Sequence, residues 1–219
     1  MRRFLTSCLL IVTLALSTST LHAHDWTETV RKVAASTVRL AHRVQVMNPF
    51  TGQVVEVDTA CSGFVINQKR GYVLTASHCL NEGTTEQLTI KGVKGPVWLI
   101  LNSPELDIAV IATTMNKPAV RPSRQVVSQG QMVGALGFGY GFQRPLFRGG
   151  YVSNTGVDVD PEIPGLWALF DGPFIGGMSG GPVFNHKGEI VGVVQMSNEI
   201  MGLWRPFSQV FAATRTYWG

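Results

Sequence analysis

The chain of 219 residues has few charged side chains, which make up 15% of it against 45% hydrophobic residues. Its 18 basic and 14 acidic residues leave a formal net charge of only +4, and no five basic residues stand in a row. Nucleic-acid-binding surfaces, coiled coils and long disordered regions need more charge, or a stronger charge pattern, than this. The 24 glycines and 11 prolines indicate instead one compact domain with many turns.

Long hydrophobic runs are also lacking. A membrane-spanning helix takes about 20 apolar residues, and no uninterrupted apolar run in the sequence reaches that length. A short apolar run, Cys8 to Leu16, follows Met1-Arg2-Arg3 and precedes small polar residues. This pattern predicts a secretory signal peptide over residues 1–23 and a mature domain over residues 24–219. A retained anchor, or a lipoprotein signal at Cys8, fits the spacing less well. We therefore expect a secreted or periplasmic protein with no stable membrane anchor.

Cysteine is scarce, with three residues in the chain. Removal of the signal peptide takes away Cys8 and leaves Cys61 and Cys79 in an oxidising compartment. We predict one disulfide between them, with two unpaired buried thiols as the alternative. The same cleavage removes Arg2 and Arg3, so the formal charge falls to about +2 and indicates no particular partner.

The mature chain begins with one short helical pattern. Asp25 precedes Glu28 by three residues, and Trp26, Val30 and Val33 recur at helical spacing. Beyond it, short segments rich in β-branched residues alternate with Gly, Pro and Asn clusters, which is typical of an all-β sandwich or barrel. A second, C-terminal helix is possible over Pro206 to Tyr217. The expected strands are 37–46, 54–57, 63–66, 72–75, 88–90, 97–101, 107–112, 132–138, 150–153, 167–170, 182–184 and 190–196.

Three segments supply residues that together could carry out acyl transfer. They are Thr75-Ala76-Ser77-His78-Cys79, Leu106-Asp107-Ile108-Ala109-Val110 and Gly177-Met178-Ser179-Gly180-Gly181-Pro182. A serine hydroxyl is a weak nucleophile, so a neutral imidazole must accept its proton, and a carboxylate must orient that imidazole. The glycines permit a strained loop in which the N–H groups of Gly177 and Ser179 form an oxyanion hole.

These motifs, with Cys61-Ser62-Gly63-Phe64-Val65-Ile66 before them and Lys187-Gly188-Glu189-Ile190-Val191-Gly192 after them, resemble those of trypsin-like serine proteases. The chain is most similar to the HtrA (Deg) protease domain without its PDZ domains. The resemblance covers roughly residues 26–215 and implies two antiparallel β-barrels with the site between them. It implies that His78 is the general base, Asp107 its orienting carboxylate and Ser179 the nucleophile. Polypeptide substrates and no metal or cofactor are expected.

The sequence departs from these families at several positions. Met178 replaces the aspartate that trypsin-like zymogens use for activation, so we expect activity after signal removal alone. Cys61 and Cys79 match the trypsin-group disulfide beside the catalytic histidine, which HtrA enzymes commonly lack. The chain stops at Gly219 with no room for a PDZ domain, so the resemblance implies neither peptide-gated activation nor cage assembly.

Specificity depends on the pocket that receives the P1 side chain, the one before the cleaved bond. Pro173 stands where trypsin has its pocket acid, and the nearby Asp171 is interpreted as structural. With Phe174 and Ile175 close by, a small or medium apolar P1 residue is expected. The strand that should bind substrate backbone by β-augmentation contains Val194, Gln195, Met196 and Ser197.

Other functions fit parts of the sequence. A trypsin-fold protein that binds peptides without cleaving them is the main alternative to an enzyme. A copper-binding protein would depend on His24, the expected mature N-terminus. His42 alternates with polar neighbours and is expected to be solvated, and His186 is expected in a turn.

Overall fold

The computed structural model describes residues 25–80, 83–158 and 165–219. The predicted signal peptide over residues 1–23 and His24 lie outside these residues. Within the described part of the chain, no helix has both the length and the apolar character needed to cross a bilayer.

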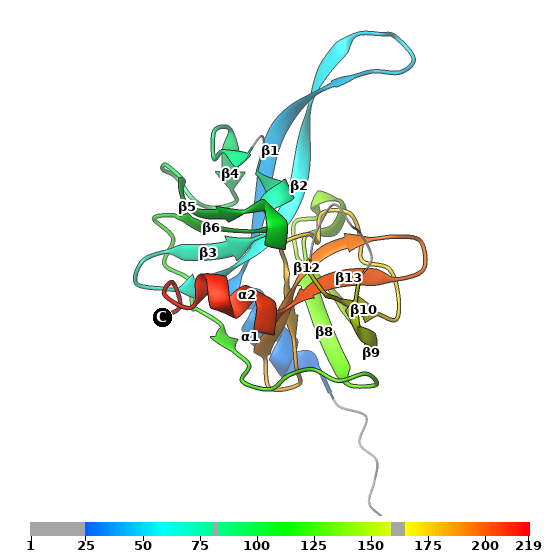
Figure 1. The fold of residues 1–219 in the computed structure, drawn as a ribbon. Coiled ribbons are helices and arrows are strands. Elements are labelled where there is room, and N and C mark those ends of the chain that lie inside the picture. The colour runs from blue at the N-terminus through cyan, green and yellow to red at the C-terminus, as the bar shows by residue number, and fades with distance from the viewer. Residues whose placement is uncertain (1–24, 81–82, 159–164) are drawn as a thin grey trace, which may run out of the picture.

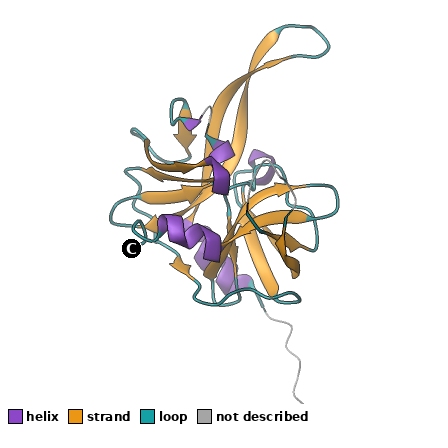
Figure 2. Ribbon diagram, viewed as in Figure 1, coloured by secondary structure: helices purple, strands orange, loops and turns teal. Residues whose placement is uncertain are grey.

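Two sheets dominate the fold, as Figures 1 and 2 show, and they are antiparallel except where β7 pairs with β12. The first has the order β4–β1–β2–β3–β6–β5 and the second the order β11–β8–β9–β10–β13–β12–β7. Because β11 also pairs with β12, the second sheet closes on itself into a barrel. The strands are β1 (Thr37–Met47), β2 (Val54–Asn67), β3 (Tyr72–Thr75), β4 (Leu88–Ile90), β5 (Trp98–Ser103), β6 (Ile108–Ala112), β7 (Arg121–Pro122), β8 (Met132–Gly137), β9 (Leu146–Val157), β10 (Trp167–Phe170), β11 (Pro182–Phe184), β12 (Glu189–Ser197) and β13 (Gly202–Pro206).

Helices pack where the two sheets meet. The α-helices are α1 (Thr27–Ser36) and α2 (Phe207–Thr214), and the 3-10 turns are η1 (Ser77–Cys79), η3 (Pro104–Leu106) and η4 (Gly139–Gly141). The N-cap of α1 is Trp26 rather than the expected Asp25, although the Asp25 carboxylate accepts a hydrogen bond of 2.8 Å from Thr27 N at the start of the helix. Figure 1 shows α2 in front of the junction between the sheets.

One hydrophobic core joins the two barrels. Phe64, Leu74 and Val110 of the first sheet belong to the same buried cluster as Phe184 and Val193 of the second. Both α-helices add to this cluster, which also contains Val33, Ile66, Ile108, Val120, Leu136, Ile190, Phe207 and Val210. The relative position of the barrels is therefore fixed by apolar packing, and any site between them inherits that rigidity.

The predicted all-β fold with a helix near each end is confirmed. One prediction was wrong in detail, because residues 54–57 and 63–66 belong to the single strand β2. Polar residues between them suggested a break, but β2 pairs with β1 continuously from Met47↔Val54 to Thr37↔Phe64. Residues 43–58, here called the arm, project from the body as a long hairpin (Figure 1).

Candidate active site

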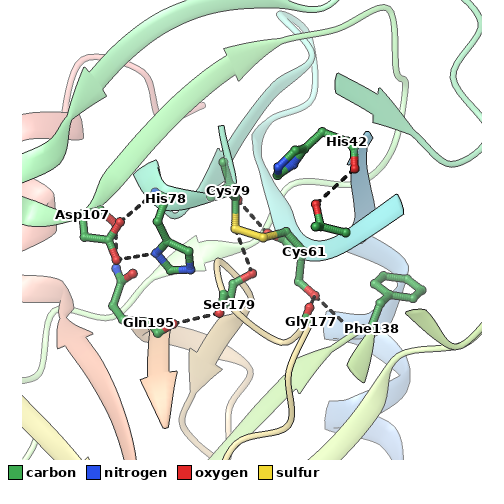
Figure 3. The surroundings of a disulfide bond; sticks show 12 residues. His42, Cys61, His78, Cys79, Asp107, Phe138, Gly177, Ser179 and Gln195 are labelled. Carbon is green, nitrogen blue, oxygen red and sulfur yellow. Dashed lines mark hydrogen bonds and ion pairs between the residues drawn. A yellow bond between two sulfur atoms is a disulfide. The ribbon is translucent and has the colours of Figure 1, made fainter. Parts of the chain in front are cut away.

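His78 and Asp107 form a close pair in the first barrel. Asp107 Oδ2 lies 2.8 Å from His78 Nδ1, and Asp107 Oδ1 accepts a hydrogen bond of 3.0 Å from His78 N (Figure 3). The Asp107 side chain is 8% exposed and that of His78 is 46% exposed. A buried carboxylate on Nδ1 fixes the tautomer that leaves Nε2 as the proton acceptor, facing the open side of the site.

The backbone of Asp107 has the left-handed conformation, with φ 51° and ψ 48°. Asp107 follows η3 directly, and its N–H donates to Pro104 O at 3.0 Å. Aspartate tolerates this region better than most residues, although it remains less favourable than the right-handed one. The conformation turns both carboxylate oxygens toward His78.

Ser179 comes from the second barrel, in the loop before β11. Its Oγ donates a hydrogen bond of 2.8 Å to Gln195 O, so in this structure the hydroxyl is engaged by β12 (Figure 3). The carbonyl of Ser179 accepts a hydrogen bond of 2.8 Å from Ser62 N on β2. This hydrogen bond connects the loop that contains Ser179 to β2 of the first barrel, which also carries His78 and Asp107.

Glycines are needed around Ser179 because neighbouring backbone approaches closely. Gly177 has φ +96°, and a Cβ there would lie 2.6 Å from Phe138 O. Gly180 has φ +79°, and a Cβ there would lie 2.2 Å from Ser62 O. Among the described residues, the N–H groups of Gly177 and Ser179 have no hydrogen-bond acceptor, so both donors remain available to an incoming oxyanion.

Ser62 holds this loop and was not singled out by sequence reasoning. It is fully buried, and its Oγ donates to Gly177 O at 2.7 Å and accepts from Phe138 N at 2.8 Å. The hydroxyl therefore fixes the peptide that follows Gly177. Its position directly after Cys61 is the signal that could have drawn attention to it.

Cys61 and Cys79 form a disulfide that joins β2 to η1. Cys79 is adjacent to His78 in sequence, and Cys61 is adjacent to Ser62. The Sγ of Cys79 lies 3.6 Å from Ser179 O. Cys61, Cys79 and His78 have ligand atoms within 4.8 Å of one another, but sulfurs in a disulfide are not the thiolates that bind zinc.

A cavity of about 310 Å³ lies beside Ser179 and is lined by four residues that the sequence assigned to substrate binding, Val194, Gln195, Met196 and Ser197. Phe174 and Ile175 also line it. The ring of Phe174 is 6% exposed and lies against Gly202, where an added Cβ would be 2.5 Å from it. Polar residues line it as well, among them Asn198 and the acidic Glu199, so the lining combines apolar and polar side chains.

Met178 and Asp171, which the sequence also singled out, have structural contacts. Met178 is fully buried and packs in the core of the second barrel. Asp171 Oδ1 accepts a hydrogen bond of 2.6 Å from Tyr151 N, which fits the structural role expected for it.

The expectation for His42 was wrong. This residue is 8% exposed rather than solvated, because β4 pairs alongside β1 at His42↔Leu88. Burial lowers the pKa of His42, and a hydrogen bond to the backbone of Cys79 partly opposes that effect.

Residues 61–193 match the family described as trypsin-like peptidase domain. The chain belongs to this family. The matched segment contains His78, Asp107 and Ser179, so all three residues of the predicted triad lie inside the part that defines the trypsin-like peptidases.

Several HtrA-type proteases resemble this trypsin-like peptidase. The serine endoprotease DegS of Escherichia coli K12 is 29% identical over 175 residues, which cover 77% of this chain and 48% of DegS. A probable periplasmic DegP-like endoprotease of Pseudomonas fluorescens is 29% identical over 143 residues, covering 63% of this chain and 29% of that protein. The chain thus spans about half the length of DegS, and less of the DegP-like protein.

Solved structures show the same fold. The HtrA-type protease AlgW with a decapeptide has a TM-score of 0.72 at 18% identity, over 88% of this chain and 67% of AlgW. The protease Rv3671c from M. tuberculosis, in its active form, has a TM-score of 0.67 at 20% identity, over 85% of this chain and 82% of that one. The predicted resemblance to the HtrA protease domain is confirmed.

Proposed function

We propose that this protein is a serine endopeptidase that cleaves peptide bonds through His78, Asp107 and Ser179. The observation that carries the proposal is the 2.8 Å contact between His78 Nδ1 and Asp107 Oδ2. This pairing prepares Nε2 to accept a proton. The names of DegS and the DegP-like proteins, both serine endoproteases, support the same chemistry.

Attack requires the Ser179 hydroxyl to leave Gln195 O and to donate to His78 Nε2. As Oγ bonds to the substrate carbonyl carbon, His78 takes its proton, and the N–H groups of Gly177 and Ser179 stabilise the oxyanion. His78 then gives the proton to the leaving amine, which leaves an acyl group on Ser179. Water, activated by His78, hydrolyses this ester and restores the serine.

The strand from Val194 to Ser197 would hold extended substrate backbone by β-augmentation. Phe174 and Ile175, which line the cavity beside Ser179, support the expected preference for a small or medium apolar P1 side chain, whereas Glu199 on the same lining is the group that a basic side chain would use. Polypeptides are accordingly the proposed substrates, and the chemistry needs no metal or cofactor.

Export is part of the proposal. The predicted signal peptide over residues 1–23 and the periplasmic DegP-like relatives support a secreted or periplasmic location. We propose residues 24–219 as the mature protease domain, active without further cleavage. Cell fractionation and N-terminal sequencing should find a chain that starts at His24 outside the cytoplasm. A cytoplasmic chain that keeps Met1 or Arg2 would contradict export.

The test of the enzyme is labelling with a fluorophosphonate probe at neutral pH. Wild-type protein should react, and Ser179→Ala should not, with circular dichroism showing that both are folded. The alternative, a peptide-binding protein without activity, is favoured by the hydrogen bond that occupies Ser179 Oγ. It predicts no labelling of folded wild-type protein.

A further inference from the structure

Two side chains of the second barrel reach into the first and bind the two backbone carbonyls on either side of the Asp107 Cα. Gln195 Nε2, from β12, donates to Asp107 O at 2.9 Å. Arg205 Nε, from β13, donates to Leu106 O at 3.2 Å. The two carbonyls that flank the left-handed Asp107 are therefore both held from the opposite barrel (Figure 3 shows Gln195 beside Asp107).

The path of β12 places Gln195 for this contact. Pairing with β13 passes from Val194↔Trp204 to Met196↔Leu203, so Gln195 is the extra residue of a bulge. Bulges redirect side chains and recur beside active sites. Gln195 is fully buried, and its Oε1 has no hydrogen-bond partner among the described residues.

Arg205 is a second buried group that packing alone does not explain. It is fully buried, and its guanidinium lies 4.0 Å from the centre of the Trp167 ring. Among the described residues, neither terminal nitrogen has a hydrogen-bond partner. Burying hydrogen-bond donors without partners is unfavourable. The free-energy cost of burying this arginine must therefore be compensated by a favourable interaction that the side chain makes.

We propose that Gln195 and Arg205 are positioning residues, which hold the backbone of Asp107 so that its carboxylate stays aligned on His78. This inference rests on the proposed function. It makes the geometry of the triad depend on the docking of the second barrel, because neither residue belongs to the barrel that carries His78 and Asp107.

Arg205 also brings a positive charge close to Asp107. The charged groups that the structure gives near Asp107 are His78 on η1 and Arg205 on β13. Glu105 on η3 is exposed and accepts a hydrogen bond from Ser103 Oγ. Burial lowers the pKa of Arg205, and the negative charge of Asp107 opposes this, but a guanidinium stays protonated in proteins. Arg205 therefore brings a permanent positive charge to the backbone that carries Asp107.

The experiment measures the second-order rate of fluorophosphonate labelling of Ser179 between about pH 5 and pH 9, where histidine titrates. Gln195→Met removes the hydrogen bond at similar side-chain volume, and we expect labelling to slow by about ten- to a hundredfold, as for a misplaced catalytic group. Arg205→Met removes the hydrogen bond to Leu106 O and should likewise slow labelling. Arg205→Lys, which keeps a hydrogen-bond donor at the end of the side chain, should partly restore the labelling rate.

Thr214→Val is the matched control. Thr214 is fully buried, and its hydroxyl donates to Val210 O and accepts from Trp218 Nε1, within the C-terminal segment. It should lower the melting temperature and leave the labelling rate and its pH dependence unchanged. If Gln195→Met, folded by circular dichroism, labels at the wild-type rate with the wild-type pH dependence, the positioning role is refuted. A folded wild-type protein that does not label refutes the proposed function instead.

Discussion

At the scale of single residues, Phe174 limits the depth of the proposed P1 pocket. Its ring is packed between Phe170, at a centroid distance of 5.0 Å, and the backbone of Gly202. Phe174→Ala should open this space to longer side chains. We expect the ratio of kcat/KM for P1 Leu over P1 Ala peptides to rise about tenfold or more, since one methylene in a pocket discriminates by roughly 10- to 200-fold.

Phe211→Ala is the control for the Phe174 variant. Phe211 is 41% exposed on α2 and packs against Phe207, away from the cavity beside Ser179. Its removal should leave the Leu to Ala ratio unchanged. An unchanged ratio in Phe174→Ala as well, or a wild-type preference for Arg or Lys, would contradict the assigned pocket.

His42 makes stability depend on pH. Its pKa lies below the ordinary value of 6.5 in the folded state, so the unfolded chain binds a proton first as the pH falls. The free energy of unfolding should therefore decrease below about pH 6.5. His42→Gln should weaken this decrease, measured as the difference in urea unfolding between pH 7.5 and pH 5. The exposed His186→Gln should follow wild type, and an equal decrease in His42→Gln would show that His42 does not contribute.

At this scale, sequence reasoning found residues whose chemistry follows from their type and motif. His78, Asp107 and Ser179 stand in local patterns, and the structure brings the first two into contact. It did not find Ser62 or Arg205, because a buried hydroxyl or guanidinium gains its role from a backbone carbonyl far along the chain. Nor did it predict that β4 covers His42, since that contact joins residues 46 positions apart.

At the scale of elements, the disulfide fixes η1 to β2 across 18 positions of sequence. In the chain-entropy account, closing a loop of this size stabilises by about 3 kcal/mol. Cys61→Ala with Cys79→Ala should lower the free energy of unfolding by about this amount, measured in urea without reductant. Wild-type protein with dithiothreitol should approach the double variant, and equal stability of all three samples would contradict a stabilising bridge.

The arm is the element least tied to the rest of the molecule. Beyond His42, where β4 stops pairing, β1 and β2 pair with each other. Apolar side chains near its turn are exposed, with Phe50 at 95% and Met47 at 69%. Replacing residues 46–55 with Asn-Gly, a turn that suits a two-residue hairpin, should leave the melting temperature and fluorophosphonate labelling unchanged. Lost labelling would mean that the arm supports the site.

The arm also shows what sequence patterns leave undetermined. Segments rich in β-branched residues predicted strands at 37–46 and 54–57, and both segments lie in strands, although 54–57 is only the first part of β2. The pattern cannot tell a strand packed on a core from one that pairs only with its hairpin partner, because both have a period of two. The number of paired residues follows from register, which is a property of both strands together.

At the scale of the whole molecule, the shared core predicts a single unfolding transition. Each barrel contributes buried residues to one cluster, including Phe64 from the first and Phe184 from the second. Neither barrel can lose its packing without exposing the other. Urea unfolding followed by fluorescence of the buried Trp167 and Trp204 should coincide with unfolding followed by far-ultraviolet circular dichroism. Two separated transitions would contradict the shared core.

The contribution of α2 and the residues after it to that core has a consequence for biosynthesis. Phe207 and Val210 pack in the cluster, and Gly219 N donates to Ile66 O at 3.0 Å. The first barrel leaves the ribosome before β12, β13 and α2 exist. Until they arrive, its inner face is uncovered and the carbonyl of Asp107 has no Gln195 to bind. A nascent chain therefore gains the hydrogen bond that holds the Asp107 backbone only after its C-terminal strands have been made.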